Sequence, residues 1–434
     1  MKNLYIWGWH SQDQEAAISS IEKKVHIKKW IRNSSQKKEL NDIIHKPQSL
    51  GFPKYTPLPR SLDNTYNESF RTFCDMYSRV AHSLSLTFNE LENLYDLYFH
   101  WAHQQLENNG IDTLLFSSPP HMGPDYLLYR IANALKIETI ICMQSILPNR
   151  FFYFDNLDNL GKKSSHTKQI ENAIDLSTWI TKPLFYMTNI QPYSKSSYGR
   201  LATHIFKATT RPSKMSLPGA YKLFALDKTY KKKIKSTNEN PDLNKPYVYF
   251  PLQLQPEMTT SFLGGRYSDQ LRALEATSSL IPDDWKIYVK ENPKQTSMQR
   301  GRWFYDRLDR IPKVDYVSPK FSSPALINSA KFVSLITGTA GFEATLEGIP
   351  CLVFGQAWYH KLPGVKQYKQ EITLEDVLNQ KWSFNDSEAA LNKLTEKCYP
   401  GIVDPVYISG FPDYQKETNI LNLKDFLLNV VVGQ

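Results

Sequence analysis

Hydrophobic and polar positions along the chain change between a period of two and a helical period, and each change predicts a new element. Residues 1–10 are predicted to form a short strand, residues 11–24 a helix, and residues 25–31 a second, alternating strand. Residues 35–65 are polar and contain proline, which indicates loop with a short helix. Helical periodicity dominates from residue 67 to residue 110. The first part of the chain therefore alternates strands and helices, as α/β proteins do.

A strand, a helix and another strand follow between residues 113 and 143 and form a βαβ unit. The junction of its first strand with the helix carries His121 and Asp125. A histidine at this place is a candidate general base, or a ligand for the carboxylate of an anionic sugar. A structural role for a lone loop histidine is the alternative. Gln144 and Arg150 follow the second strand and are further candidates at the same edge of the sheet.

A strand–turn–helix–strand pattern occupies residues 332–355. Its turn consists of the small residues Thr337, Gly338, Thr339, Ala340 and Gly341. The N–H groups of this turn lie at a helix N-terminus, where the partial positive charge favours a phosphate. Glu343 follows about one turn into the helix, where a carboxylate can accept hydrogen bonds from a ribose diol. Phosphate and ribose together indicate a nucleotide, although an ordinary βαβ unit with packing glycines is the alternative.

Residues 285–290 are predicted to form another strand of the same domain, which Pro293 brings to an end. Lys290, Asn292 and Lys294 therefore cluster at the C-terminal end of that strand, where open α/β sheets bind ligands. The positive charge of a lysine can pair with a phosphate, and an asparagine can donate one hydrogen bond and accept another. A solvated strand end is the alternative, but two such ends in one domain favour a binding site.

A third strand begins at residue 247 and opens into a polar loop. The loop contains one carboxylate, on Glu257, followed by three hydroxyl groups, two glycines and a cation, on Thr259, Thr260, Ser261, Gly264, Gly265 and Arg266. A sugar-handling site fits a first strand that opens into such a loop. The alternative is a helix cap that is rich in hydroxyl groups.

The three segments that begin near residues 247, 285 and 332, taken in chain order, resemble the bacterial capsule polysaccharide biosynthesis family. That family is related to retaining transferases of Kdo and other ulosonic acids. The similar blocks lie within residues 247–366, at 252–257, 290–293, 336–343, 354–359 and 363–365. Weaker similarity reaches residues 119–121, 125–126 and Gln144. The resemblance implies an α/β, GT-B-like architecture of two Rossmann-like domains with a cleft between them, in which the C-terminal domain holds the nucleotide-sugar.

The resemblance also implies a retaining glycosyltransferase that moves a 3-deoxy ulosonic acid from its CMP donor to a capsular or surface glycan acceptor. Many Kdo-transferring relatives carry histidine where this chain has Asn292, and aspartates near Met258 and Thr259. These departures favour a pseudaminic-type nonulosonic acid over Kdo. CMP has one phosphate, so the turn N–H groups, a hydroxyl and a lysine suffice for it. We therefore expect no metal and no cofactor beyond the CMP-activated sugar.

Specific roles follow for the residues of these motifs. The nucleotide-binding set is Lys290, Asn292, Pro293, Thr337, Gly338, Thr339, Ala340, Gly341 and Glu343. The sugar-binding set is Gln255, Thr259, Thr260, Ser261, Arg266, Trp358 and Tyr359, in which Arg266 meets the sugar carboxylate and the two aromatic residues wall the ligand. The catalytic candidates are Glu257, as nucleophile or stabilising carboxylate, and His121 and Asp125. The alternatives are helix capping for Glu257 and core packing for the aromatic pair.

Two other functions remain open on the same residues. One is transfer from a UDP- or GDP-sugar, or of a phosphoalcohol from a CDP donor, in capsule synthesis. The other is a non-catalytic subunit of capsule assembly that retains a nucleotide-sugar fold. The density of motifs at three strand ends argues against the second, because a scaffold needs no such site.

Composition and charge indicate the cellular compartment of the protein and a class of binding partner. The chain has 434 residues, no apolar run of membrane-spanning length and no N-terminal signal peptide, so we expect a cytoplasmic protein. Its four cysteines are widely spaced and fit neither a metal site nor a disulfide framework. The formal net charge of +9 is concentrated around residues 207–235. No nucleic-acid motif accompanies this charge, so peripheral contact with acidic lipids of the inner membrane, or a lipid-linked glycan acceptor, is favoured over a solvated linker.

The expected domain organisation follows from these patterns. Residues 1–215 are predicted as an N-terminal, acceptor-side Rossmann-like domain and residues 216–243 as a basic linker. Residues 244–410 are predicted as the C-terminal, nucleotide-sugar-binding Rossmann-like domain. A C-terminal helix within residues 411–434 is expected to cross back to the N-terminal domain.

Overall fold

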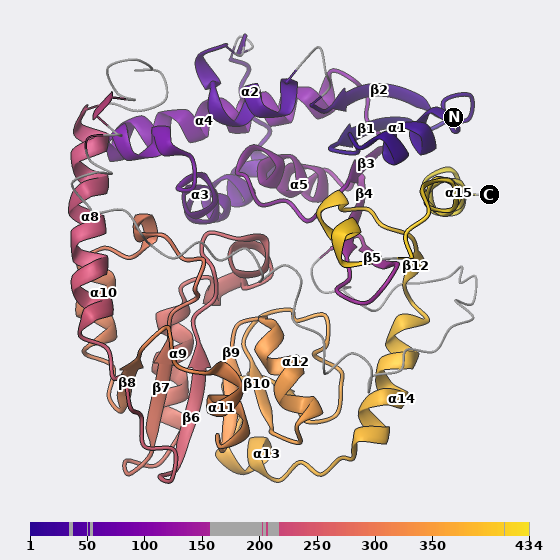
Figure 1. The fold of residues 1–434 in the computed structure, drawn as a ribbon. Helices are drawn as coiled ribbons and strands as arrows, with labels where there is room; N and C mark the ends of the chain where they lie inside the picture. Colours follow the sequence, from indigo (N-terminus) through magenta and orange to yellow (C-terminus); the bar gives the residue numbers. More distant parts are fainter. Residues whose placement is uncertain are drawn as a thin grey trace. The chain divides into compact units, whose positions relative to one another are not determined.

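The computed structural model describes most of the chain, namely residues 1–33, 38–49, 51–52, 55–156, 202, 205–206, 217–411 and 413–433. Contacts between Cα atoms divide it into two compact units. Among the described residues, unit 1 consists of residues 1–156 and 394–433, and unit 2 of residues 202–393. Each unit is built on its own sheet (Figure 1).

The sheet of unit 1 has six strands in the order β12-β5-β4-β3-β1-β2. Their bounds are β1 Asn3–Trp7, β2 His26–Ile31, β3 Thr113–Phe116, β4 Glu138–Gln144, β5 Arg150–Phe154 and β12 Tyr399–Pro400. Strands β1 to β4 are parallel, whereas β5 is antiparallel to β4, and β12 is antiparallel to β5. The accompanying helices are α1 Gln12–Ser19, α2 Glu39–His45, α3 Asp63–Tyr77, α4 Phe88–Glu107 and α5 Pro124–Ala134.

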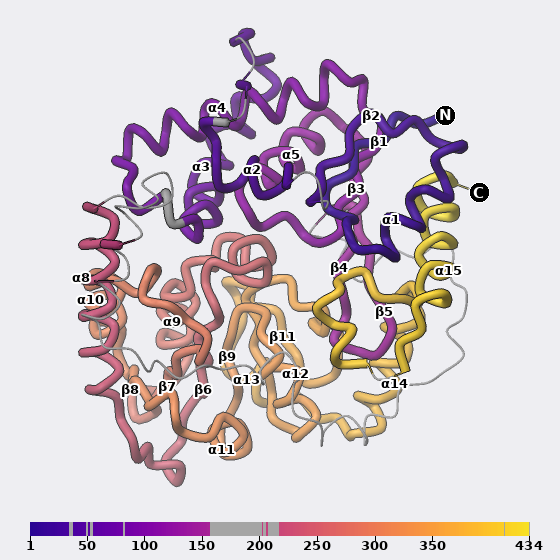
Figure 2. The backbone as a smooth tube through the Cα atoms, turned by 45° about the horizontal axis from the view of Figure 1, so that its top comes forward, coloured from indigo at the N-terminus to yellow at the C-terminus, as the bar shows by residue number. Residues whose placement is uncertain are grey.

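The C-terminal segment of the chain belongs to unit 1. Helix α15 (Lys416–Phe426) packs against α1, and a π-helical turn (Leu427–Val432) continues it (Figure 2). The ring of Phe426 stacks on Trp9 with centroids 6.2 Å apart, and the Gln14 side chain donates a 2.7 Å hydrogen bond to the Val403 carbonyl. The chain passes from unit 2 back to unit 1 at residue 394, inside helix α14 (Phe384–Thr395). The observed boundary therefore lies before residue 410, the predicted end of the C-terminal domain.

The sheet of unit 2 is wholly parallel, in the order β11-β10-β9-β6-β7-β8. Its strands are β6 Tyr247–Pro251, β7 Lys286–Lys290, β8 Val314–Val317, β9 Phe332–Leu335, β10 Cys351–Val353 and β11 Val365–Gln367. The helices are α8 Leu217–Lys235, α9 Gln270–Leu280, α10 Arg302–Leu308, α11 Ser323–Asn328, α12 Thr339–Leu346, α13 Leu374–Leu378 and most of α14. The continuous apolar runs of β6 and β9 form strands because helices cover parallel sheets on both faces.

Both units have the Rossmann-like plan of parallel strands joined through helices. This confirms the predicted α/β, GT-B-like fold of two Rossmann-like domains. In unit 2 the chain leaves β6 towards β7 and β8 and then returns to place β9 on the other side of β6. Ligands of open α/β sheets bind at such a reversal of strand order, beyond the carboxyl ends of the strands.

Most of the stretch predicted as a basic linker, residues 216–243, is helical. Helix α8 covers Leu217–Lys235, because Tyr230 and Ile234 pack into the hydrophobic core of unit 2 and give the helix a partner. The cations Lys207, Arg211 and Lys214 lie outside the described residues. No helix in the described part of the chain is long and apolar enough to cross a membrane.

Candidate functional site

Two loops meet at the strand reversal of unit 2, one after β6 and one after β9. The side-chain carbonyl of Gln253 accepts a 2.6 Å hydrogen bond from the backbone N–H of Thr337, and its Nε2 donates to the Thr337 hydroxyl at 3.2 Å. That hydroxyl donates in turn to the Thr259 carbonyl at 2.6 Å. The amide and the hydroxyl of Thr337 are therefore both used to join these loops. This corrects the prediction that Thr337 itself binds phosphate.

The turn after Thr337 still presents backbone donors at the start of α12. Gly338 is the N-cap residue of this helix and no side chain caps it. The N–H groups of Gly338 and Ala340 have no hydrogen-bond partner among the described residues, whereas Gly341 N–H donates to the Gly338 carbonyl at 3.2 Å. The backbone donors of the predicted turn that are left unpaired are therefore those of Gly338 and Ala340.

Glycine at position 341 is required by close packing behind the turn. A Cβ atom there would lie 2.6 Å from Cys351 Sγ and would clash with the Tyr359 hydroxyl. The Tyr359 hydroxyl donates to the Gly338 carbonyl, and Trp358 packs with Phe342 at a centroid distance of 5.0 Å. Tyr359 is 0% exposed and Trp358 is 7% exposed. The predicted wall for the ligand is thus wrong, because both aromatic rings pack in the core and support the turn from behind.

Glu343 lies on α12, about one turn beyond the uncapped start of the helix. Its side chain is half-buried and has no hydrogen-bond or ion-pair partner among the described residues. Burial raises the pKa of this carboxyl group above its ordinary value. Its charge is close enough to add to the effect of burial in raising the pKa of Tyr249 on β6. An acceptor without a partner, close to unpaired backbone donors, is compatible with the predicted ribose contact.

Lys290, the last residue of β7, is 7% exposed. Its Nζ donates to the Phe321 carbonyl at 2.6 Å and to the Ser323 hydroxyl at 2.7 Å, and Tyr249 donates to the same hydroxyl at 3.2 Å. Burial lowers the pKa of Lys290 to about 8. The lysine therefore connects the end of β7 to the start of α11, with two neutral acceptors for its ammonium group.

The residue after Lys290 forms an ion pair that the sequence motifs did not reveal. The guanidinium of Arg300 donates to both carboxylate oxygens of Glu291, at 2.8 Å and 3.3 Å, and both side chains are 0% exposed. The Tyr316 hydroxyl donates to the same carboxylate at 3.2 Å, and Arg300 also reaches the Gln253 carbonyl at 3.4 Å. This pair fixes the loop after β7 next to the loop after β6.

Asn292 and Pro293 lie in the loop that the ion pair holds. The Asn292 side-chain carbonyl accepts a 2.9 Å hydrogen bond from Lys294 N–H, which makes a tight local turn. The NH₂ group of Asn292 has no partner among the described residues and is available to a ligand. The structure thus brings Asn292, but not the buried ammonium of Lys290, to the rim of the predicted nucleotide site.

Glutamine side chains support the loop after β6. Gln255 donates through Nε2 to the Ser268 carbonyl at 2.9 Å, and its Oε1 accepts from Gln270 Nε2 at 3.2 Å. Gln270 also exchanges two hydrogen bonds with the backbone of Gln253, at 2.7 Å and 2.9 Å, and Gln295 exchanges two with that of Gln255, both at 2.9 Å. The predicted sugar-binding role of Gln255 is corrected, because both ends of its side-chain amide form hydrogen bonds within the loop, to Ser268 and Gln270.

Glu257 begins a single π-helical turn, Met258–Phe262. Its Oε2 lies 3.5 Å from Thr259 N–H, and its backbone carbonyl accepts from Ser261 N–H at 2.7 Å. The capping alternative therefore describes its backbone well, while the long side-chain contact leaves the half-buried carboxylate little constrained. Thr260 and Ser261 are buried, so a direct sugar contact is left to the half-buried Thr259.

Arg266 follows in a 3₁₀ turn, Gly265–Tyr267, and is exposed. Its guanidinium lies 5.2 Å from the centroid of the Tyr267 ring and has no carboxylate partner among the described residues. A guanidinium in this state can pair with the carboxylate of a ligand through two parallel hydrogen bonds.

The catalytic candidates of unit 1 lie after β3, beside β1. The buried Asp125 carboxylate accepts three backbone hydrogen bonds, from His121 at 2.9 Å and from Met122 and Tyr126 at 2.8 Å each. The carboxylate therefore holds the loop before α5 against the first turn of that helix, which corrects its assignment as a catalytic residue. His121 Nδ1 lies 2.7 Å from the Pro119 carbonyl. Because a carbonyl only accepts, Nδ1 carries the proton, and Nε2 of the neutral ring is left with the lone pair of a general base.

Two other candidates of unit 1 are buried and structural. The Gln144 side-chain carbonyl accepts from Val403 N–H at 2.7 Å and from Asp404 N–H at 3.2 Å, which ties the C-terminal segment to β4. Arg150 is buried at the start of β5. In the part of the chain that the structure describes, no group of histidine, cysteine and carboxylate side chains is arranged to hold a metal ion.

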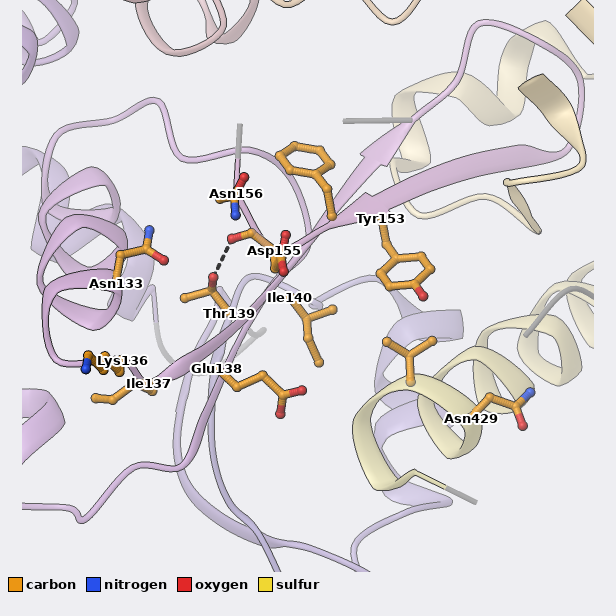
Figure 3. Close-up of a pocket in the computed structure, with 12 residues that line it drawn as sticks. Asn133, Lys136, Ile137, Glu138, Thr139, Ile140, Tyr153, Asp155, Asn156 and Asn429 are labelled. Carbon is orange, nitrogen blue, oxygen red and sulfur yellow. Dashed lines mark hydrogen bonds between the residues drawn. The ribbon is translucent and has the colours of Figure 1, made fainter. Parts of the chain in front are cut away.

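A cavity of about 350 Å³ in unit 1 lies apart from His121, which does not line it (Figure 3). It opens where β4 begins and β5 ends, and Thr139 donates a 2.5 Å hydrogen bond to the Asp155 carbonyl at its side. Asn133, Glu138 and Asn429 line it as well. None of the predicted site residues belongs to this cavity.

The fold and the site together define a two-unit α/β protein in which the uncapped start of α12 and the carboxylate of Glu343, which has no hydrogen-bond or ion-pair partner among the described residues, lie at the strand reversal of unit 2. Residues 204–399 match the family described as capsule polysaccharide biosynthesis protein. The match includes β6 to β11 and the loops described above, and it confirms the resemblance found in the sequence. Comparison with curated proteins gave no match.

Solved structures with a remote likeness include two transferases and one epimerase. One is Thermosulfurimonas dismutans KpsC, beta Kdo 2,7 transferase, with 13% identity over 98% of this chain and 99% of that one and a TM-score of 0.36. KpsC, beta Kdo 2,4 transferase, from the same organism has 12% identity over 74% and 88% of the chains and a TM-score of 0.32. The UDP-GlcNAc 2-epimerase of Methanocaldococcus jannaschii has 12% identity over 91% and 99%, with a TM-score of 0.26.

Proposed function

We propose that this protein is a glycosyltransferase of capsule or other surface-glycan synthesis and that unit 2 binds its nucleotide-sugar donor. The observation that carries the proposal is Glu343, a half-buried carboxylate without a partner among the described residues, next to the uncapped start of α12. A carboxylate in this state is costly to bury unless a ligand pairs with it. A nucleotide supplies both a phosphate for the turn and a ribose diol for the carboxylate.

The proposed donor is a CMP-activated ulosonic acid. Its single phosphate lies against the N–H groups of Gly338 and Ala340, and Asn292 donates to it or to the base from the neighbouring loop. Arg266 pairs with the carboxylate that every ulosonic acid carries. Asn292 and the Met258–Thr259 pair are the positions that favour a pseudaminic-type sugar over Kdo. The family match of residues 204–399 supports an acceptor in capsule synthesis, and we place the reaction in the cytoplasm.

The proposed chemistry is transfer with retention, and it needs no metal ion because the leaving group carries one phosphate. Backbone dipoles fixed at that phosphate stabilise the charge that develops there as the glycosidic bond breaks. Glu257 is the proposed nucleophile or the carboxylate that stabilises the anomeric centre. His121, whose Nδ1 contacts the Pro119 carbonyl, is the proposed base for the acceptor hydroxyl.

The direct test is to incubate the protein with CMP-Kdo, CMP-pseudaminic acid and CMP-sialic acid and to follow the release of CMP. Release with one or more of these donors is expected, and UDP- and GDP-hexoses serve as controls. Turnover with UDP- or GDP-hexoses only would overturn the CMP proposal. Failure with every donor, together with stable purification in complex with capsule export proteins, would favour the non-catalytic assembly subunit.

A further inference from the structure

One face of helix α8 (Leu217–Lys235) points away from unit 2 and has no partner in it. The face consists of positions separated by three or four residues, which fall on one side of a helix, namely Leu217, Tyr221, Ala225, Lys228, Lys232 and Lys235. All six are exposed. We call these six residues the outer face of α8. Nineteen-residue α8 is long enough for this face to extend over about 27 Å.

The opposite side of α8 explains why the helix forms and how it is oriented. Tyr230 and Ile234 pack into the core of unit 2, and α8 lies beside α10 in both views (Figures 1 and 2). A Cβ atom on Gly301, at the start of α10, would lie 3.1 Å from Leu226 Cδ2. The helix is therefore fixed by one side, and its outer face is held towards solvent.

The lysines of α8 differ in whether they form an ion pair. Lys231 forms an ion pair with Asp227 at 3.5 Å, and Lys233 forms one with Asp309. Lys228, Lys232 and Lys235 on the outer face have no carboxylate partner among the described residues. The outer face thus carries three lysines that no carboxylate of the described residues neutralises, and the exposed Lys222, which follows Tyr221 in the sequence, is a fourth such lysine of α8.

The first half of the outer face is apolar. Leu217 is 56% exposed and Tyr221 is 69% exposed, and Ala225 separates them from the lysines. A soluble polyanion would be matched by the lysines alone and would gain nothing from a leucine and a tyrosine. A bilayer surface matches both halves, because tyrosine and leucine enter the headgroup boundary while lysines contact acidic headgroups.

We propose that the outer face of α8 binds an acidic lipid surface and holds unit 2 against it. The proposal is independent of the donor and the reaction proposed above. Its occupant is a bilayer that contains an anionic phospholipid, because charge complementarity and the apolar half point to the same partner. The overall charge of +9 favours the encounter as well.

The test is co-sedimentation of the full chain with vesicles, without any nucleotide-sugar. We expect binding to vesicles of phosphatidylglycerol mixed with phosphatidylcholine, and little binding to pure phosphatidylcholine. Binding should fall as salt is raised, because the Debye length shortens from about 10 Å at 0.1 M to about 3 Å at 1 M. The triple variant K228Q/K232Q/K235Q should bind on the order of a hundredfold more weakly, since each lysine near an acidic surface contributes about fivefold.

A matched control removes three exposed lysines from elsewhere in unit 2, as K366Q/K369Q/K381Q, and should bind almost as the wild type does. The pair L217S/Y221S tests the apolar half at constant charge and should also weaken vesicle binding. Equal losses in the control and in the outer-face triple variant would overturn the proposal, as would a wild-type protein that binds dextran sulfate but no acidic vesicle. Thermal unfolding of each variant checks that it is folded.

Discussion

Glu291 and Arg300 form a two-point ion pair from which water is excluded, with N–O distances of 2.8 Å and 3.3 Å and both side chains 0% exposed. The pair connects the loop after β7 to the backbone of Gln253 after β6. It is thus a fully buried polar contact between the two loops of the candidate site.

Removing one member of this pair should destabilise unit 2 strongly. Arg300→Met leaves the Glu291 carboxylate buried without its cation, and we expect a loss of about 3–5 kcal/mol in the free energy of unfolding. The double variant Glu291→Met with Arg300→Met should recover much of that loss, because no unpaired charge remains. Urea unfolding of the three proteins checks this. A double variant that is as unstable as the sum of the single ones would contradict it.

Gln253→Leu should weaken nucleotide binding. The substitution removes two hydrogen bonds to Thr337, each worth about 0.5–1.5 kcal/mol, and releases the turn that presents the N–H groups of residues 338–340. We expect the Kd for CMP to rise roughly 5- to 100-fold in calorimetric titration. Gln380→Leu is the control, because that amide bonds to carbonyls remote from the turn, including that of Val377 at 3.0 Å. Unchanged CMP affinity in Gln253→Leu would argue against a role in positioning the turn.

Glu343→Gln and Glu257→Gln should fail in different ways. If Glu343 accepts hydrogen bonds from the ribose, the Glu343→Gln variant should lose about 1.5–3 kcal/mol of binding free energy. This loss would be measured as weaker affinity for CMP and for the donor. If Glu257 acts on the anomeric centre, the Glu257→Gln variant should bind the donor almost normally but lose most of the turnover. Titration and CMP-release assays on both variants separate the two roles. Near-normal turnover of Glu257→Gln would move the search for the catalytic group to His121.

Stability should depend on pH through Lys290. Burial lowers its pKa from 10.5 to about 8, so between these values the unfolded chain binds more protons than the folded one. The free energy of unfolding contributed by this group therefore rises with pH from about 8 to 10.5, and it is constant below about pH 8, where both states are protonated. Urea unfolding at several pH values should show this rise in the wild type and lose it in Lys290→Met. Lys286→Met, at the exposed start of the same strand, should keep it.

The sequence predicted the sheet of unit 2 better than it predicted the residues behind the site. Strands such as β7 and β9 are short apolar runs that end at a proline or a glycine-rich turn, and this signal is local. Gln253 and Thr337 lie 84 positions apart, and Gln255 and Gln295 lie 40 apart, so no local pattern indicates either contact. Such partners become visible only when the register of the strands is known.

Other residues could have been assigned more fully from local signals. Asp125 follows Gly123 and Pro124, and an acidic residue directly after proline at a helix start is typical of the first turn, where it accepts hydrogen bonds from nearby backbone N–H groups. Tyr230 and Ile234 are four residues apart within the lysine-rich stretch, which is the spacing of a buried helical face. The lysines around them obscured this pattern and favoured a linker.

The packing of the C-terminal segment in unit 1 determines the order in which the two units can fold during synthesis. Strand β12 and helix α15 complete the sheet and the core of unit 1, where Phe426 covers Trp9 and Phe151. During synthesis the ribosome delivers all of unit 2 before it delivers these residues. Unit 2 can therefore fold while the chain is still growing, whereas the part synthesised first must wait for the part synthesised last. A nascent chain that stops at residue 393 would leave Trp9 uncovered and expose it to chaperones and proteases.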